Sequence, residues 1–457
     1  MKEYQLSELI EIKHGYAFDG EHIVTEDNGI VLVTPGNFKI GGGFQEEKCK
    51  FFTGEIPKEY ILSAGDYIVT MTDLSKTIDT LGYSAIVPQS KSRTYLHNQR
   101  IGLIKFISDE CEPDYIYYLM QTHKYQRAIA NTSTGATVHH TSPSKIREYK
   151  FLAPEIQTQK RIAKTLRAYD DLIENNQKQI KLLEEAAQRL YKEWFVDLRF
   201  PGYEITPIID GVPQGWDKHG FAEIADIMSG GTPKTDNLSY YDGNIPFYTP
   251  KDSDSSFFAF DTITHISEEG LKNCHSKYFP AGTVIITARG TVGKTTMLAV
   301  PMAMNQSCYA LKCDKLNSPY YLFFALNQEV AKLKTMANGG VFDTIIVKTF
   351  DSITLTIPDK SIVSAFNALI EPIMGQIKAK TKMIISLKQA RDRLLPKLMS
   401  GEIDVSEKKR AEILQLPKKI SYEEFLVELG MAARAKSISE TDLKAMYEAY
   451  LDNEATE

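Results

Sequence analysis

Two stretches of the chain place apolar residues in alternating steps of three and four, the heptad spacing of long helices that pack against another helix. The repeating positions are Leu166, Tyr169, Ile173, Asn176, Ile180, Leu183, Ala187, Leu190 and Trp194 in the first stretch and Ile370, Ile373, Ile377, Lys380, Ile384, Leu387, Arg391, Leu394 and Leu398 in the second. At about 1.5 Å per residue, each stretch predicts a helix of roughly 50 Å. The polar residues Asn176 and Lys380 occupy equivalent core positions, as in helices whose register is specified at some cost in stability. Two unrelated amphipathic helices, each buried in its own domain, are the alternative interpretation.

Each helical stretch follows a region with a different pattern. Residues 1–153 and 204–357 are rich in Gly, Thr, Tyr and Phe, and short β-branched runs alternate there with turn signals such as Gly41-Gly42-Gly43. One helix is expected inside each region, over Asp114–Ala130 and Pro319–Ala337, because apolar residues recur there at helical spacing. The expected fold class is therefore α+β: two β-rich domains, each followed by a long helix, with the two helices pairing as an antiparallel coiled coil.

The two halves of the chain also repeat each other in sequence. Matches keep their order, and the offset changes from 215 to 217 to 207 residues before it settles at 204, as expected for a diverged duplication with variable loops. Examples are Glu8-Leu9-Ile10-Glu11-Ile12 with Glu223-Ile224-Ala225-Asp226-Ile227, Gly65-Asp66-Tyr67-Ile68 with Gly282-Thr283-Val284-Ile285, Asn98-Gln99 with Asn305-Gln306, and Arg189-Leu190 with Arg393-Leu394. The predicted organisation is a first domain (1–153), a central helix (154–203), a second domain (204–357), a distal helix (358–403) and a C-terminal helical extension (404–457).

The composition is that of a globular protein: of 457 residues, 43% are hydrophobic and 25% are charged. The net charge of −6 does not exclude nucleic acid, because residues 401–457 alone carry 8 basic and 13 acidic groups. DNA binding needs a local basic face rather than a basic total. No apolar run reaches about 18 residues and the first residues lack a signal-peptide pattern, so no membrane span or export is expected. Five cysteines without a C-x-x-C spacing favour the cytoplasm over a disulfide framework or a zinc site.

Motifs concentrated in the second half resemble those of the specificity subunit of type I restriction-modification systems. These motifs are Ser229-Gly230-Gly231-Thr232-Pro233, Pro246-Phe247-Tyr248-Thr249-Pro250-Lys251-Asp252, Gly282-Thr283-Val284-Ile285-Ile286-Thr287-Ala288-Arg289-Gly290-Thr291-Val292-Gly293-Lys294, and the helix end Arg393-Leu394-Leu395-Pro396-Lys397-Leu398-Met399-Ser400-Gly401-Glu402-Ile403. With the duplication, the resemblance covers residues 1 to about 405. The first half departs from these motifs, since Met71-Thr72-Asp73 stands where the second half has Ala288-Arg289-Gly290.

The resemblance implies that each β-rich region is a target recognition domain that reads one half of a split, asymmetric site on double-stranded DNA. It implies that the paired helices space the two domains and bind two methyltransferase (modification) subunits, which recruit restriction subunits for host defence. Methylation of adenine, rather than cytosine, is likewise implied by the resemblance alone. In such a subunit no catalytic residue, cofactor or metal is expected.

Four motifs suggest enzymatic chemistry, and each has a simpler interpretation. Ala288–Thr295 fits a relaxed phosphate-binding loop, but a β-like run follows where that loop needs a helix. Asn317-Ser318-Pro319-Tyr320 is one residue from an adenine-methyltransferase motif, and helix initiation explains it better. Pro113-Asp114 with Glu148-Tyr149-Lys150 is similar to a nuclease triad, but Asp114 begins a helical pattern. His139-His140 lacks metal-ligand spacing, because neighbours on a strand point to opposite faces.

The candidate DNA contacts come from polar loops that recur in both halves. Asn and Gln can pair with adenine, Arg can pair with guanine, and Lys and Thr mostly contact phosphates, although each loop could also be purely structural. In the first half the candidates are Lys13, His14, Thr34, Asn37, Thr72, Lys76, Asn98, Gln99, Arg100, Thr134 and His139. In the second half they are Lys234, Thr249, Lys251, Arg289, Thr291, Lys294, Asn305, Gln306 and Asn338.

The sequence therefore favours a non-catalytic DNA-recognition subunit that positions a methyltransferase and a nuclease. Two other hypotheses remain open at this point. A single-chain enzyme acting on DNA would methylate or cut DNA without partners. A protein-interaction scaffold would show no salt-sensitive affinity for DNA in its assembled complex, whereas contacts to the DNA backbone require that affinity to fall with salt.

Overall fold

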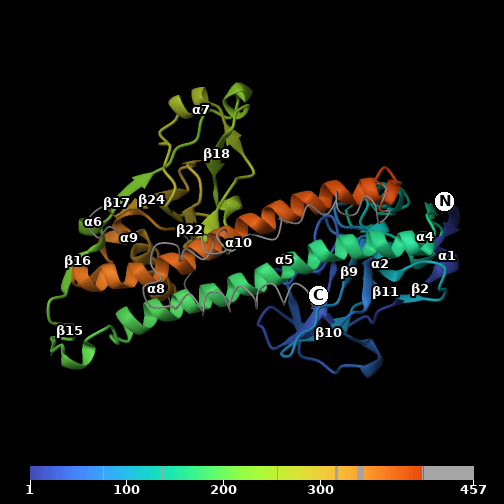
Figure 1. Cartoon of the computed structure of the whole chain (residues 1–457), viewed down its shortest axis with the longest axis horizontal. Coiled ribbons are helices and arrows are strands. Elements are labelled where there is room, and N and C mark those ends of the chain that lie inside the picture. Colours follow the sequence, from blue (N-terminus) through green and yellow to red (C-terminus); the bar gives the residue numbers. More distant parts are fainter. Residues whose placement is uncertain are drawn as a thin grey trace, which may run out of the picture. The chain divides into compact units, whose positions relative to one another are not determined.

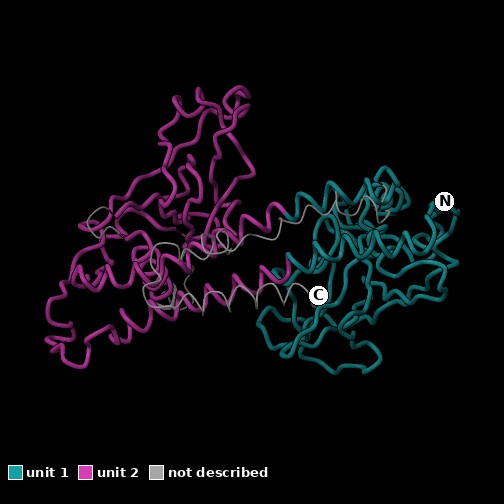
Figure 2. Tube along the Cα trace, in the orientation of Figure 1, with its two compact units in different colours: residues 1–172, 387–421 teal, residues 173–386, 422–457 magenta. Residues whose placement is uncertain are grey.

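The computed structural model describes residues 1–403 and 405, apart from 76, 136, 255, 314–317 and 337–343. The described residues fall into two compact units (Figure 2). Unit 1 contains residues 1–172 and the described part of 387–421, and unit 2 contains residues 173–386. The boundaries at 172/173 and 386/387 fall inside two long helices, so each unit combines one β-rich region with a segment of both helices. Apart from Val405, the predicted C-terminal extension lies outside the described residues.

The two heptad stretches form long helices, α5 (Ile156–Tyr191) and α10 (Lys360–Ser400) (Figure 1). A proline lies two residues before the start of each, where the chain is still extended. α5 continues into a π-helical turn, η4 (Lys192–Val196), and α10 is followed by Gly401 in the left-handed conformation that often ends helices. None of the predicted heptad core positions is exposed, which confirms both helices.

Unit 1 contains two principal sheets. Their strands are β2 (Ile10–His14), β3 (Ile23–Val24), β4 (Ile30–Val33), β5 (Lys50–Phe52), β6 (Ile61–Leu62), β7 (Tyr67–Thr70), β9 (Ser84–Ile86), β10 (Thr94–His97) and β11 (Ile101–Phe106). A five-stranded sheet has the order β3-β5-β4-β10-β6, in which β4 and β10 are parallel. A four-stranded antiparallel sheet has the order β2-β11-β7-β9.

Unit 2 repeats this plan. Its principal strands are β17 (Asp226–Ser229), β18 (Ile245–Tyr248), β19 (Phe258–Ala259), β20 (His265–Ile266), β21 (Val284–Thr287), β22 (Thr295–Leu298), β23 (Ala303–Met304) and β24 (Cys308–Lys312). The sheet β17-β24-β21-β22-β19 reproduces the order β2-β11-β7-β9 and adds β19 at its edge. In the sheet β20-β18-β23, β18 and β23 are parallel, as are β4 and β10. The internal repeat seen in the sequence is therefore a repeat of topology.

Short ribbons and helices complete each region. An antiparallel ribbon joins the start of a region to its end: β1 (Lys2–Gln5) with β13 (Lys150–Ala153), and β16 (Asp217–Gly220) with β25 (Thr354–Ile357). Two further ribbons are β8 (Thr72–Asp73) with β12 (His139–His140), and β14 (Ile208–Ile209) with β15 (Val212–Pro213). The short helices are α1 (Leu6–Leu9), η1 (Gly20–His22), η3 (Lys58–Tyr60), α4 (Pro143–Arg147), η5 (Tyr203–Ile205), α6 (Phe221–Ile224), η6 (Leu238–Tyr241), α7 (Glu268–Lys272) and α9 (Val347–Asp351).

The helix expected over Asp114–Ala130 is wrong as a single element. Unit 1 has two helices there, α2 (Pro113–Leu119) and α3 (His123–Asn131). The second begins because the Thr122 side chain accepts a hydrogen bond from the backbone N–H of Tyr125, at 3.3 Å, as an N-cap. The corresponding helix of unit 2, α8 (Pro319–Met336), is continuous as predicted.

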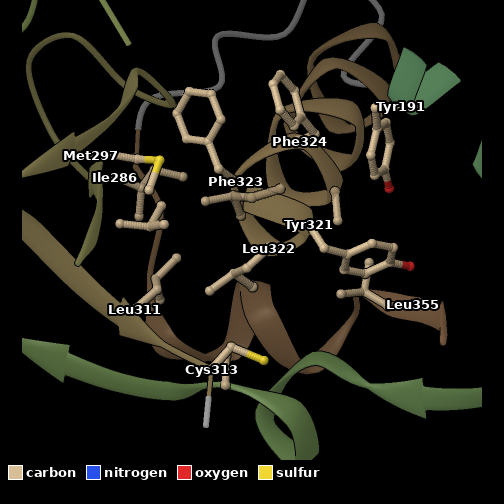
Figure 3. Close-up of a cluster of buried hydrophobic side chains, with 14 of the residues drawn as sticks. Tyr191, Ile286, Met297, Leu311, Cys313, Tyr321, Leu322, Phe323, Phe324 and Leu355 are labelled. Carbon is tan, nitrogen blue, oxygen red and sulfur yellow. The ribbon is translucent and has the colours of Figure 1, made fainter. Parts of the chain in front are cut away.

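Large side chains of α8 fill the core of unit 2 (Figure 3). Phe323 and Phe324 are 1% and 3% exposed, and the ring of Phe324 stacks on that of Tyr191 from α5, with 5.8 Å between centroids. Figure 3 shows that side chains of α8 face sheet residues on one side and Tyr191 on the other. The same cluster includes Ile286, Met297 and Leu311 from the sheet, Ala187 from α5, and Phe366, Ile370, Met374 and Ile377 from α10.

In unit 1 the first part of α5 packs against the last part of α10. Leu166 and Leu398, both fully buried or nearly so, belong to one core cluster. Four residues further along α5, Asp170 forms an ion pair with Arg391, seven residues before Leu398. Increasing residue numbers in α5 therefore meet decreasing numbers in α10, so these segments run antiparallel within unit 1.

All five cysteines are free, and Cys111, Cys308 and Cys313 are buried. No helix among the described residues combines the length and apolarity that a membrane span requires.

Glu184 of α5 offers a pH-dependent test of the packing in unit 2. Burial raises the pKa of its carboxyl group from the ordinary value of 4.5 to about 7, against the opposing effect of a hydrogen bond with the backbone of Phe257. Between these values the folded state binds more protons than the unfolded state, so this group lowers stability progressively as the pH rises through that window. We expect Glu184→Gln to raise the thermal midpoint clearly at pH 8 and much less at pH 5.

Glu185→Gln is the matched control, because Glu185 is the exposed neighbour on the same helix. Its thermal midpoint should follow that of the wild type at both pH values in circular-dichroism melts. A Glu184→Gln effect that is the same at pH 5 and pH 8 would contradict the burial of an ionisable carboxyl group at this position.

Candidate nucleic-acid interface

Both units build the same turn after the central parallel strand. In unit 1 the turn is η2 (Pro35–Asn37), where the backbone N–H of Thr34 donates to Asn37 Oδ1 at 2.8 Å. In unit 2 it is η7 (Pro250–Asp252), where the backbone N–H of Thr249 donates to Asp252 Oδ2 at 2.8 Å. These reciprocal caps fix the backbone of both turns.

A second turn recurs after the other parallel strand of each unit. It joins β10 to β11 in unit 1 and β23 to β24 in unit 2. In unit 1 the Asn98 side chain accepts from the backbone N–H of Arg100 at 3.0 Å, and in unit 2 the Asn305 side chain accepts from the backbone N–H of Ser307 at 3.0 Å. These contacts are Asx-turns, which hold the following residue, Gln99 or Gln306, at the tip of the turn. Both Gln side chains are exposed.

A glycine lets a third segment lie directly on each Asn-Gln turn. A Cβ atom at Gly15 would lie 2.2 Å from the backbone oxygen of Asn98, and one at Gly230 would lie 2.3 Å from the backbone oxygen of Asn305. Only a residue without a side chain fits such close backbone approaches. The end of β2 or β17 is thereby held against the second turn in each unit.

The Arg289–Lys294 loop joins these turns in unit 2. The backbone N–H of Ala288 donates to the Ser307 oxygen at 2.7 Å, and the Thr291 hydroxyl donates to the Pro250 oxygen at 3.3 Å. The Thr232 hydroxyl donates to the Gln306 side chain from the segment after β17. Four loops far apart in the sequence therefore meet, and we call them the unit 2 loop cluster: residues 230–234, 249–252, 288–294 and 305–307.

The unit 2 loop cluster presents a basic and amide-bearing surface. Its exposed predicted contacts are Lys234, Lys251, Arg289, Thr291, Lys294 and Gln306. Thr249 and Asn305 are half-buried and take part in the turns. Asn338 lies outside the described residues. The guanidinium group of Arg289, the ammonium groups of the lysines and the amide of Gln306 suit phosphate and base-edge contacts on DNA.

Unit 1 has the same two turns but exposes different side chains on them. Its exposed predicted contacts are Lys13, His14, Gln99, Arg100 and Thr134, whereas Thr34 and His139 are half-buried. Lys13 lies over the ring of Tyr60, with 4.9 Å from Nζ to the centroid. The backbone N–H of Met71 donates to the Arg100 oxygen at 3.0 Å, so the end of β7 meets the Asn98 turn as in unit 2. Lys76 lies outside the described residues.

Three predicted contacts of unit 1 prove to be buried. Asn37 is 0% exposed, and its side-chain amide donates to the Gln45 oxygen at 3.2 Å. Asn98 is held by its Asx-turn, and the Thr72 hydroxyl is 3.1 Å from His140 Nδ1. These three side chains are at most 7% exposed and take part in the hydrogen bonds that shape the loops. A sequence cannot distinguish an asparagine that caps a turn from one that reads a base, because both occur in polar loops.

Asp73 is not among the predicted contacts, although it belongs to the segment in which the first half departs from the second-half motif. It occupies the position that Gly290 has in the second half. Its carboxylate accepts from the backbone N–H groups of Ser75 and Leu81 at 2.6 and 3.0 Å, and from the Thr80 hydroxyl at 2.8 Å. Burial would raise the pKa of Asp73, but these hydrogen bonds outweigh burial and lower the pKa. In unit 1, Asp73 therefore holds the backbone of Ser75, Thr80 and Leu81 in place.

Burial lowers the pKa of His97 to about 4, so this ring below the first-half turn is neutral at physiological pH. Among the described residues, no group of three His, Cys, Asp or Glu side chains is placed to hold a metal ion.

The simpler interpretations of the enzyme-like motifs agree with the structure. Gly293-Lys294 leads into strand β22 rather than a helix, and Pro113 begins α2. Ser318 caps α8, since its hydroxyl accepts from the backbone N–H of Tyr321 at 3.1 Å. His139 and His140 lie side by side on strand β12.

Comparisons with known proteins agree with this geometry. The sequence pattern of the family described as "Type I restriction modification DNA specificity domain" matches residues 1–185 and 213–383. The chain is 27% identical over 302 residues to the specificity subunit of the type I restriction enzyme MjaIX of Methanocaldococcus jannaschii, covering 64% of this chain and 70% of that one. It is 25% identical over 357 residues to the HindI specificity subunit of Haemophilus influenzae, covering 64% and 77%.

The fold is also found in a solved structure. The crystal structure of the type I restriction-modification S subunit from M. genitalium superimposes with a TM-score of 0.53 at 16% identity, covering 89% of this chain and 96% of that one. The chain therefore belongs to the type I restriction-modification DNA specificity family, as a DNA-recognition subunit whose catalytic activities reside in partner subunits. This confirms the family resemblance and the α+β fold class.

The glycine contacts can be tested by adding one methyl group. Gly15→Ala or Gly230→Ala should cost about 1–3 kcal/mol of unfolding free energy, because the new Cβ overlaps a backbone oxygen that cannot move aside. Urea unfolding followed by circular dichroism measures the loss. Gly20→Ala is the control, since a Cβ there meets no atom within 4 Å. If all three variants unfold at the same urea concentration, the close approach described here is wrong.

Proposed function

We propose that this chain reads a bipartite, asymmetric site on double-stranded DNA, with one half-site read by each unit. The observation that carries the proposal is that both units build one frame of turns and present unlike side chains on it. Unit 2 exposes Arg289 where unit 1 has the buried Thr72, and unit 1 has the buried Asp73 where unit 2 has Gly290. Unlike surfaces on like frames favour two different half-sites rather than a palindrome.

Each exposed group of the unit 2 loop cluster has a distinct role in this proposal. Arg289 is the base reader, because a guanidinium can donate two parallel hydrogen bonds to guanine O6 and N7. Gln306 has the same bidentate chemistry for adenine. Lys234, Lys251 and Lys294 contact phosphates, which adds affinity without sequence information. In unit 1 these roles fall to Gln99, Arg100, Lys13 and His14.

The long helices space the units and hold the partners. We propose that α5 and α10 pair as one antiparallel coiled coil and bind two methyltransferase subunits, through which restriction subunits join. Apolar side chains exposed on these helices, Leu182, Leu369 and Met383, support a role as a protein-binding surface. The restriction-enzyme names of the relatives support the same partners. Free cysteines and DNA as the target favour the cytoplasm as the site of action.

The proposal is tested by Arg289→Ala in the complex assembled with the methyltransferase subunit. If Arg289 reads a base, affinity for the cognate duplex should fall by roughly 1–3 kcal/mol, while affinity for unrelated duplex changes far less. Fluorescence anisotropy over a range of salt concentrations measures both. Affinity of the wild-type complex should fall with salt, because phosphate contacts release counterions.

Lys218→Ala is the charge-matched control. Lys218 is exposed on the edge ribbon β16–β25 and outside the unit 2 loop cluster, so its loss should leave specific binding nearly unchanged. Equal effects of Arg289→Ala and Lys218→Ala would remove Arg289 from the interface. A wild-type complex whose DNA affinity does not respond to salt would contradict DNA recognition itself.

A further inference from the structure

An ion pair joins the two long helices within unit 1. Arg391 Nη1 of α10 donates to Asp170 Oδ1 of α5 at 2.6 Å, and the Tyr118 hydroxyl of α2 donates to Asp170 Oδ2 at 2.6 Å. The side chains of Arg391 and Asp170 are 25% and 21% exposed. Arg391 also donates to Asp392, at 2.8 Å. Both oxygens of Asp170 thus have partners in a largely buried contact.

The internal repeat assigns a counterpart to each member of this pair. At the offset of 204 residues, Asp170 corresponds to Met374 of α10, and Arg391 corresponds to Ala187 of α5. Met374 and Ala187 are both 0% exposed and belong to one core cluster of unit 2. The two positions that form the ion pair in unit 1 are therefore occupied by buried apolar residues in unit 2.

This difference separates correct from incorrect pairing of the helices. The heptad seams of α5 and α10 are alike. Burial of apolar side chains alone therefore distinguishes poorly between an α5–α10 pair and a pair of like helices, α5–α5 or α10–α10, from two copies of the chain. If α5 paired with α5 of a second copy in the same register, Asp170 would face Ala187. If α10 paired with α10, Arg391 would face Met374. Either arrangement leaves a buried charge without its partner, which is strongly unfavourable.

We propose that the Asp170–Arg391 pair is a pairing-specificity device that restricts α5 to α10 and excludes pairs of like helices between two copies of the chain. A single polar contact in an otherwise apolar seam is an established way to specify helix partners at some cost in stability. For a DNA-recognition subunit the consequence is direct. Pairs of like helices would join like recognition units, whereas the ionic contact keeps two unlike units together.

The test replaces the ionic contact with the apolar contact that the chain already uses. The variant Asp170→Met/Arg391→Ala/Tyr118→Phe places the apolar residue types of Met374 and Ala187 at the corresponding positions of unit 1. It also removes the Tyr118 hydroxyl, which would lose its acceptor. After refolding from urea at micromolar concentration, native mass spectrometry should find at least tenfold more dimer than for the wild type. Glu174→Ala/Lys178→Ala removes an exposed ion pair of α5 with 2.6 Å between Nζ and Oε1, and should leave the dimer fraction unchanged.

A crosslink identifies which helices pair in any dimer. If residue 170 faces residue 187 of a second α5, then residue 179 faces residue 178, so Gln179→Cys should crosslink to itself with a short bis-maleimide. The half-buried Cys49 and Cys274 are replaced by Ser in this background. A dimer crosslinked through residue 179 is the expected result. An uncrosslinked dimer, or a variant that stays monomeric like the wild type, would overturn the proposal.

A second variant, in which the charges of residues 170 and 391 are exchanged, keeps the test valid if the apolar variant fails to fold. Asp170→Arg/Arg391→Asp keeps an ion pair across the helices and still leaves unpaired charges in like-helix pairs. We expect this variant to refold as a monomer, with a dimer fraction within about twofold of the wild type. Dimers crosslinked through residue 179 in this variant would show that the pair does not control pairing.

Discussion

Burial of one apolar seam along each long helix is the constraint on which the rest of the chain depends. Neither β-rich region closes its core alone: Leu166 and Leu398 complete the core of unit 1, and Tyr191 and Phe366 complete that of unit 2. Because each helix enters both units, neither region can be removed without exposing part of a seam. The helices are thus components of both cores as well as connections between them.

Both units repeat the same hydrogen-bonded turns, and the side chains exposed on those turns differ between the units. Gly15 and Gly230 bring the end of a strand onto an Asn-Gln turn in both units, and partly buried hydrogen bonds fix the backbone there. Side chains on these turns are free to differ, as the exposed Arg289 of unit 2 and the buried Thr72 at the same position of unit 1 illustrate. Such a division lets recognition change without loss of the fold. The same asymmetry extends to the helices, where Asp170 and Arg391 stand opposite each other and their counterparts are apolar.

The sequence predicts long elements well and local roles poorly. Heptad spacing identified α5 and α10 because it persists over many turns, and the repeat identified corresponding strands. The break between α2 and α3 escaped detection because one capping contact of Thr122 outweighs helical periodicity. At the candidate interface, the loops that meet in unit 2 could be predicted from the sequence. Which of their side chains form the hydrogen bonds of the turns could not. Asn37 and Asn98 look the same as exposed contacts until the backbone groups that they satisfy are known.

The most direct test of the central claim is to co-express the chain with its methyltransferase subunit and map modified bases across the host genome. Two units that read unlike half-sites at a fixed spacing predict one split motif: two short, different sequences separated by a constant nonspecific gap. Modification at a palindrome would contradict the unlike surfaces of the two units. Modification that is absent with both subunits, or present without this chain, would mean that the units do not recognise DNA sequence.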